Sequence, residues 1–419
     1  MRDWKTSFRA LWIAEFIAIT GFQTSNPILP LYLGELGLSD PQAVYWWTGA
    51  INSSAAIALA VFAPIWGAVA DGYGRRLMLL RAMVGGTILV GLMAFAREPW
   101  QILALKTLQG CVTGTVAAAT VLTASIVPAK EAGYRLGLLQ MAVFLGNSAG
   151  PLFGGVVADL AGARFTFLAT SALLAFSVYI VLTRVEEKFT PKPKSKSLLR
   201  NALPDFSVLA KSPALASLLF VTFSVQLANM VVGPIIPLIV KELAGGGAGI
   251  ASLSGLIIAA SSMAGALAAV VVGKISARLG YGRALLLCLG GAFVFYLPQG
   301  LVRSPYALLA LRVGSGFFLG GTMPSVNALI ASLCDRDKQG STYGLSASVS
   351  SAGGAIGPAL GAVVATSAGN AAVFYATSAI LALTGLAVGA GVRARAKGPR
   401  GGSADSAPTD NAPTGGAPA

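Results

Sequence analysis

The chain has 419 residues, of which 55% are hydrophobic and 11% are charged, whereas soluble domains contain about 25% charged residues. The apolar residues are grouped in runs long enough to cross about 30 Å of hydrocarbon as helices. Together with a net charge of +14 and the absence of histidine, this composition excludes an ordinary soluble protein, and it predicts an all-α polytopic membrane protein with 12 transmembrane helices.

The predicted spans fall into two sets of six. A helix satisfies all its backbone amides internally, as a membrane requires. Residues 1–183 are expected to form an N-terminal six-helix bundle and residues 212–392 a C-terminal one. Residues 184–211, which contain a Pro-Lys-Pro-Lys run, are expected to be a cytoplasmic linker, and residues 393–419 a disordered cytoplasmic tail. The spans are expected to begin near Phe8, Val44, Leu77, Trp100, Tyr134, Phe165, Pro213, Gly249, Arg283, Pro305, Thr342 and Ala371.

The first span contains one acidic residue, Glu15, about 10 Å along the helix from its cytoplasmic end. An ionised acid at that depth is costly unless it faces water, a partner or a proton. Asn26 follows eleven residues later and is predicted to share its face, with Gln23 nearby. We interpret Glu15 as a group that couples transport to protons or substrate. The alternatives are a structural, hydrogen-bonded acid and an interfacial residue at the end of the span.

A glycine-containing turn follows the second span, from Gly67 to Arg76. Its sequence, Gly-Ala-Val-Ala-Asp-Gly-Tyr-Gly-Arg-Arg, resembles the loop motif of the major facilitator superfamily, except that the family has a basic residue where Gly72 stands. The resemblance implies a cytoplasmic latch between Asp71 and the eleventh span near Thr342. The alternative is a solvated loop acid. The predicted gating loop consists of Gly67, Asp71, Gly74, Arg75 and Arg76.

Cations occupy the fourth and tenth spans, as Lys106 and Arg312. They stand 206 residues apart, at equivalent places in the two halves. The sequence around Lys106 resembles the family's motif in the fourth span, which is usually built on arginine. Lysine lacks the planar fork of arginine, so the arginine's role does not carry over directly. Both residues are candidate cavity residues, and pairing with backbone carbonyls is the structural alternative.

The fifth span contains Gly146-Asn-Ser-Ala-Gly150-Pro151-Leu-Phe-Gly154-Gly155. This segment resembles the signature of the superfamily's antiporters, particularly those that exchange drugs for protons. Gly146, Gly150 and Gly154 repeat every four residues and form a flat face on one side of a helix, and Pro151 removes a backbone donor. The stripe suits a helix that slides against a neighbour. Generic tight packing is the alternative.

The second half repeats the first. Asn26-Pro-Ile-Leu-Pro-Leu returns as Gly233-Pro-Ile-Ile-Pro-Leu, and Gly150-Pro151 returns as Gly357-Pro358, each 207 residues later. Six spans separate equivalent points, so the repeats are expected to be parallel, about an axis along the membrane normal. Gln226 and Asn229 in the seventh span are polar candidates for the lining of a central cavity, together with Asn52, Gln140 and Asn327.

Basic residues are unevenly distributed among the polar breaks that separate the predicted spans. Most of the 30 fall in alternate breaks and at the two ends of the chain, which places both termini in the cytoplasm by the positive-inside rule. A basic membrane surface explains the charge, and no nucleic-acid partner is expected. The other breaks contain only Arg97, Arg164, Lys241 and Arg303.

These features predict a secondary active transporter in a bacterial inner membrane. We expect a monomer with a cavity lined by spans one, four, seven and ten, as the resemblance implies, which exports small lipophilic drug-like compounds in exchange for protons by alternating access. The chain has no phosphate-binding loop and no metal-ligand spacing of its cysteines, so no enzyme activity, cofactor or metal is expected. A cavity with both Lys106 and Arg312 would favour neutral or anionic cargo. The alternatives are an exporter of sugars, amino acids or other metabolites, and a non-transporting membrane sensor or scaffold.

Overall fold

The computed structural model describes residues 4–187, 213–333 and 339–397, and in these ranges every regular element is helical. Most of the expected linker and of the expected tail lie outside the described residues. The first half contains α1 (Trp4–Ser25), α2 (Leu29–Glu35), α3 (Pro41–Tyr73), α4 (Arg75–Met93), α5 (Pro99–Val112), α6 (Thr115–Ile126), α7 (Ala129–Ala161) and α8 (Ala163–Arg184).

The second half has the same order of long helices, with two short 3-10 segments. Its elements are α11 (Pro213–Val232), η1 (Gly233–Ile235), α12 (Ile236–Leu243), α13 (Ile250–Leu279), α14 (Tyr281–Tyr296), η2 (Leu297–Leu301), α15 (Pro305–Leu333), α16 (Gln339–Ala368) and α17 (Asn370–Lys397).

Helices or consecutive helix pairs make the membrane spans. Ten stretches within the described residues are long and apolar enough to cross a bilayer. The other two expected spans lie in α1, which is less apolar because it contains Arg9, Glu15 and Gln23, and in the 33-residue α3. The prediction of an all-α, 12-helix membrane protein built from two six-helix repeats is confirmed.

The two repeats break their first spans at equivalent places. In the first half the chain turns after α1 and restarts as α2, with Pro30 in the first turn of the new helix. In the second half α11 passes through η1, which begins Gly233-Pro234, before α12. Proline cannot donate to the preceding turn, so both helices change direction there. The fourth span is also broken, at Gly114, whose φ of +134° is suited to glycine, whereas its counterpart α15 is continuous.

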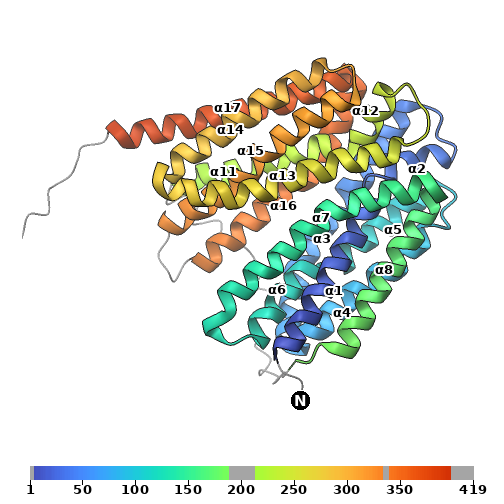
Figure 1. Cartoon of the computed structure of the whole chain (residues 1–419), viewed down its shortest axis with the longest axis horizontal. Coiled ribbons are helices and arrows are strands. Elements are labelled where there is room, and N and C mark those ends of the chain that lie inside the picture. The colour runs from blue at the N-terminus through green and yellow to red at the C-terminus, as the bar shows by residue number, and fades with distance from the viewer. Residues whose placement is uncertain (1–3, 188–212, 334–338, 398–419) are drawn as a thin grey trace, which may run out of the picture.

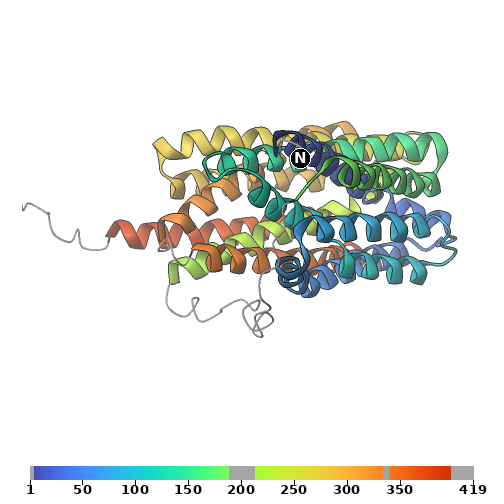
Figure 2. The ribbon, with the colours of Figure 1, turned by 90° about the horizontal axis from the view of Figure 1, so that it is seen from below.

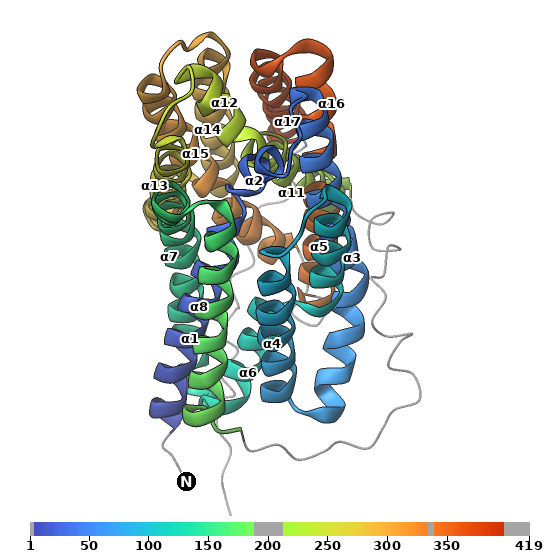
Figure 3. The same ribbon diagram turned by 90° about the vertical axis from the view of Figure 1, so that its right-hand side faces the viewer.

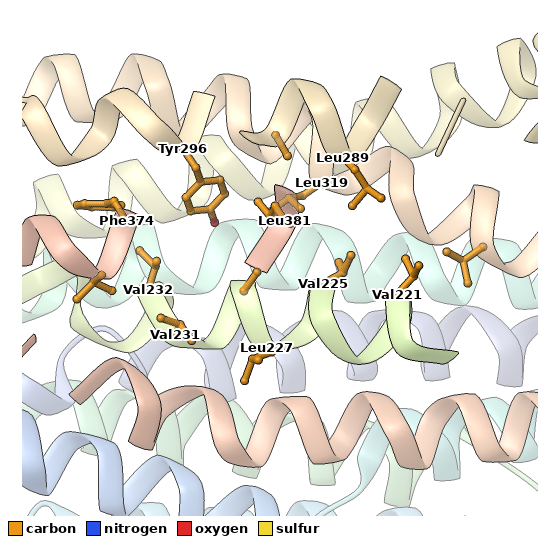
Figure 4. Packing of buried hydrophobic residues seen from close by; sticks show 14 of the residues in the cluster. Val221, Val225, Leu227, Val231, Val232, Leu289, Tyr296, Leu319, Phe374 and Leu381 are labelled. Carbon is orange, nitrogen blue, oxygen red and sulfur yellow. The ribbon is translucent and has the colours of Figure 1, made fainter. Parts of the chain in front are cut away.

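Each half has its own buried apolar core. One cluster is formed by side chains between Ala10 and Val185, with Ala251 of the other half, and a second by side chains between Leu215 and Val388. Figure 4 shows part of the second cluster, in which the side chains of Val221 and Val225 on α11 point towards Leu289, Leu319 and Leu381.

The halves lie side by side and meet along two helix pairs, α7 with α13 and α3 with α16. Figures 1 and 2 show α1–α8 grouped on one side and α11–α17 on the other. Figure 3 shows α2 and α12 close to each other, far from the N-terminus. This end of the bundle, which holds α2 and α12, is called the α2/α12 end.

Candidate functional site

A cavity of about 710 Å³ lies between α7 of the first half and three helices of the second. Five of the predicted cavity residues line it: Gln140 on α7, Gln226 and Asn229 on α11, and Arg312 and Asn327 on α15. The remaining lining residues are Phe144, Asn147, Val225, Ile258, Ser261, Ser262, Gly265, Ala266, Ala269, Gly316, Leu319, Gly320, Met323 and Pro324.

The wall of this cavity combines apolar side chains with neutral amides and hydroxyls. Arg312 is the one charged residue among the described residues that line it. Its side chain is only 7% exposed, and its Nη1 donates a hydrogen bond to the hydroxyl of Tyr296 at 2.9 Å. Its Nε has no hydrogen-bond partner among the described residues. A buried cation therefore stands in the wall with part of its donor capacity unused.

This cavity is formed by the fifth, seventh, eighth and tenth spans, of which the seventh and the tenth were expected to line a cavity. Glu15, Asn26 and Lys106 are not among its lining residues. The reason lies in α7, which packs on α1 with one face and on α13 with another, so α7 stands between the first span and the cavity.

Glu15 is completely buried in α1. Neither carboxylate oxygen has a hydrogen-bond partner among the described residues. The hydroxyl of Thr115, at the start of α6, faces the carboxyl group without making a hydrogen bond of normal geometry. A carboxylate in such a place is strongly disfavoured in its ionised form. This is the environment expected of a group that takes up a proton.

Lys106 and Asn26 belong to one chain of hydrogen bonds. The Lys106 Nζ donates to Asn26 Oδ1 at 3.3 Å, and Asn26 Nδ2 donates to Gln23 Oε1 at 2.6 Å. Gln23 Nε2 then donates to Asn147 Oδ1 at 2.5 Å. Asn147 lines the cavity, so the chain links the buried lysine of α5 to the cavity wall. Asn26 lies just beyond the end of α1, and the polar face expected from Glu15 to Asn26 does not continue as one helix.

The gating loop is described in part. Thr342 lies in the first turns of α16, but its side chain and that of Asp71 are not among those that the structure describes. Gly74 has a φ of +100° and precedes α4. The backbone N–H groups of Arg75 and Arg76 donate to the carboxylate of Glu187, at 3.1 and 2.8 Å.

Arg76 also acts through its side chain. Its Nη2 donates to the carbonyl of Leu182 at 2.8 Å, in the last turn of α8. Thus Glu187 caps the start of α4 while Arg76 caps the end of α8, which ties these two helix ends together.

The glycines of the antiporter motif bring α7 against two different helices. A Cβ added to Gly146, Gly150 or Gly154 would collide with Ile19, Gln23 or Thr24 of α1. A Cβ on the adjacent Gly155 would collide with the carbonyl of Ala251 in α13. The stripe therefore packs α7 within its own half, while Gly155 packs it against the other half. Pro151 lies inside α7, which continues through it.

Sequence reasoning missed the full extent of the repeat. Gly353, Gly357 and Gly361 of α16 stand 207 residues after the stripe, and a Cβ on any of them would collide with Phe223, Met230 or Val231 of α11. The offset already visible at Gly357-Pro358 was the signal that could have found them. The second contact between the halves also uses a glycine: a Cβ on Gly49 of α3 would lie 2.9 Å from the carbonyl oxygen of Pro358.

Polar contacts join the halves at the α2/α12 end. The carboxylate of Asp159, on α7, accepts hydrogen bonds from the backbone N–H groups of Ala251 at 3.3 Å and Ser252 at 2.7 Å, in the first turn of α13. On the side of α3, the Tyr45 hydroxyl donates to Asn370 Oδ1, at the start of α17, at 2.7 Å. Asn370 Nδ2 in turn donates to Glu242. The sequence holds no signal for the Asp159 and Tyr45 contacts, because their partners come from opposite halves.

Comparisons with known proteins agree with this geometry. A family model described as Major Facilitator Superfamily matches residues 11–298 and 218–414. The chain is 35% identical to the Multidrug resistance protein MdtG of Proteus mirabilis (strain HI4320), over 90% of this chain and 94% of that protein. It is also 35% identical to the MdtG of Serratia proteamaculans (strain 568), over 90% and 92% of the two chains.

Solved structures share the fold at low sequence identity. A bacterial homologue of the human lysosomal transporter Spinster, described as inward-facing and unoccupied, matches 93% of this chain and 97% of its own with a TM-score of 0.75 at 14% identity. A point mutant of the nucleoside transporter NupG matches 91% of this chain and 99% of its own with a TM-score of 0.75 at 16% identity.

Proposed function

Because the chain belongs to the Major Facilitator Superfamily, we propose that it is a secondary active transporter that exports small lipophilic, drug-like compounds in exchange for protons. It acts in a bacterial inner membrane with both termini in the cytoplasm, and the α2/α12 end faces outward. The uneven distribution of basic residues between alternate breaks supports this orientation.

The cavity between α7, α11, α13 and α15 is the observation that carries the proposal. Its volume of about 710 Å³ suits a drug-sized ligand, since such sites occupy roughly 300–1,000 Å³ and combine apolar walls with few polar groups. Phe144, Leu319 and Met323 supply apolar surface, while Gln226 and Asn229 supply amides. Relatives named Multidrug resistance protein MdtG support a drug-like cargo rather than a sugar.

The places where the halves touch support alternating access. Two glycine contacts, at Gly155 and Gly49, and the Asp159 cap join the halves. Separation of these contacts would open the cavity to the outside, and closure at the opposite end would shield it from the cytoplasm. A ligand or proton that binds the two arrangements with different affinity shifts the population between them.

Glu15 is the proposed proton carrier. Its carboxyl group is fully buried and lacks a hydrogen-bond partner among the described residues, so the neutral acid is stable where the carboxylate is not. Release of the proton requires that water or a partner reach α1. Proton release and helix rearrangement are therefore coupled.

Reconstituted vesicles test the proposal. The purified full chain is placed in liposomes with an imposed proton gradient, and the flux of the anionic dye dansylglycine, the cationic dye ethidium and glucose is followed. We expect gradient-driven flux of dye and not of glucose. In Glu15→Gln the dependence of flux on the gradient is lost, while Glu98→Gln, which changes an exposed glutamate, behaves like the parent.

Two results would contradict this account. If no dye moves under the gradient, the proposed function is wrong. If Glu15→Gln retains the pH dependence of the parent, the proton is carried elsewhere.

A further inference from the structure

We propose that the central cavity prefers organic anions, and that Arg312 binds the carboxylate or sulfonate group of a solute whose apolar body fills the rest of the site. The inference deepens the proposed function and rests on it in one respect, that this cavity is the substrate site.

The first argument is the charge of the cavity wall. Among its described lining residues Arg312 is cationic and none is acidic. Glu15, the buried acid of α1, lies outside this lining. A positive charge that is 7% exposed is poorly screened by water. The cavity therefore attracts an anion and repels a cation.

The second argument is the state of the guanidinium. One nitrogen, Nη1, is held by the hydroxyl of Tyr296 at 2.9 Å, and the guanidinium carbon lies 5.6 Å from the centre of that ring. Tyr296 is itself completely buried, so the planar group is fixed in orientation. The Nε is itself shielded from the cavity, and no carboxylate among the described lining residues balances the charge of the group. An anion that enters the cavity and contacts the guanidinium neutralises a buried charge.

The counterpart in the other half does not compete for the anion. Lys106 occupies the equivalent place, but its ammonium group donates to Asn26 and does not line the cavity. The two cations therefore do not form a symmetric pair around one ligand. The cavity has one anion-binding position, on the side of α15.

The rest of the lining defines the shape of the ligand. Phe144 on α7 and Ile258 on α13 are apolar, as are Leu319 and Met323 further along α15. Met323 stands eleven residues after Arg312, about 16 Å along a helix at 1.5 Å per residue. A solute with an anionic group at one end and an aromatic or aliphatic body matches this arrangement.

A matched set of fluorescent probes tests the inference. Dansylglycine is an anion, dansylamide is neutral and dansylcadaverine is a cation at neutral pH, and all three share one ring system. Binding to the purified full-length protein is measured by fluorescence anisotropy. We expect dansylglycine to bind about tenfold or more tightly than dansylcadaverine, the range expected when a charged group gains or loses one hydrogen-bonded partner.

Variants locate the effect. Arg312→Gln should weaken dansylglycine binding by about tenfold or more and leave dansylamide within about twofold. Arg312→Lys, which keeps the charge, should retain part of the preference for dansylglycine. It also keeps the inference testable if Arg312→Gln fails to fold. Arg303→Gln removes an exposed cation outside the cavity and should match the parent.

The inference is overturned if the three probes bind equally, if dansylcadaverine binds most tightly, or if Arg312→Gln leaves the preference for dansylglycine unchanged. Equal binding combined with proton-driven flux of ethidium would remove the anion preference and leave the proposed function standing. Selective binding of dansylglycine without any driven flux would support the anion site and count against export.

Discussion

Removal of the Asp159 carboxylate should weaken the contact between α7 and α13 at the α2/α12 end. In Asp159→Ala the backbone N–H groups of Ala251 and Ser252 lose their acceptor. Asp40→Ala is a matched control, because Asp40 accepts from the N–H groups of Gln42 and Ala43, at 3.0 and 3.2 Å, in the first turn of α3. That cap lies within one half, whereas the Asp159 cap joins the two halves.

The expected size follows from helix capping. Replacement of a capping side chain by alanine costs about 0.5–2 kcal/mol. For Asp159 this loss falls only on the arrangement in which the α2/α12 end is closed, so the ratio of closed to open molecules should fall by about 2- to 30-fold. For Asp40 the loss affects both arrangements equally, and the ratio should not change.

Distances between spin labels measure that ratio. Labels at Leu160 of α7 and Leu256 of α13, both exposed, report the separation of the two helix ends in a protein without its native cysteines. Asp159→Ala should increase the long-distance population, and Asp40→Ala should leave it as in the parent. Identical distance distributions in the parent and in Asp159→Ala would show that the cap does not hold the halves together.

Two further substitutions test the packing that positions the site. Gly154→Ala forces a methyl group against the Thr24 carbonyl and should lower the unfolding free energy by about 1–3 kcal/mol. Gly137→Ala, on the same helix, meets open space and should raise the melting temperature. A higher melting temperature in both variants would refute the close contact at Gly154. Tyr296→Phe removes the acceptor of the Arg312 hydrogen bond and should lower the unfolding free energy by about 1–3 kcal/mol. Tyr306→Phe, at a residue that is 71% exposed, should leave the melting temperature unchanged. Equal melting temperatures of the two variants would contradict a stabilising bond between Arg312 and Tyr296.

The spans and the repeat were predictable because they depend on local features. Apolar length fixed the helices to within a few residues, as at Pro213 and Pro305, which begin α11 and α15. The glycine spacing of the fifth span predicted a flat helix face, and that face packs closely against α1; its role in sliding stays a prediction. Such patterns are visible in a sequence because each residue meets the requirement by its own chemistry, without a partner far away in the chain.

The shape of the site was less predictable, because it depends on distant partners. Lys106 and Arg312 have equivalent positions and similar burial, yet one donates to Asn26 and the other faces the cavity. Asn26, at the end of α1, is the partner of Lys106, and the second half has Gly233 at the equivalent position. Likewise, Asp159 binds backbone groups, whose positions no side-chain pattern reveals.

A reversible cross-link between the halves tests the central claim that they move against each other around the cavity. Cysteines replace Tyr45 on α3 and Asn370 at the start of α17, whose side chains are hydrogen-bonded at 2.7 Å, and a short bifunctional thiosulfonate joins them. Proton-driven efflux of dansylglycine should stop in the linked protein and return when dithiothreitol removes the link. Efflux at the same rate before and after the link is removed would contradict the account.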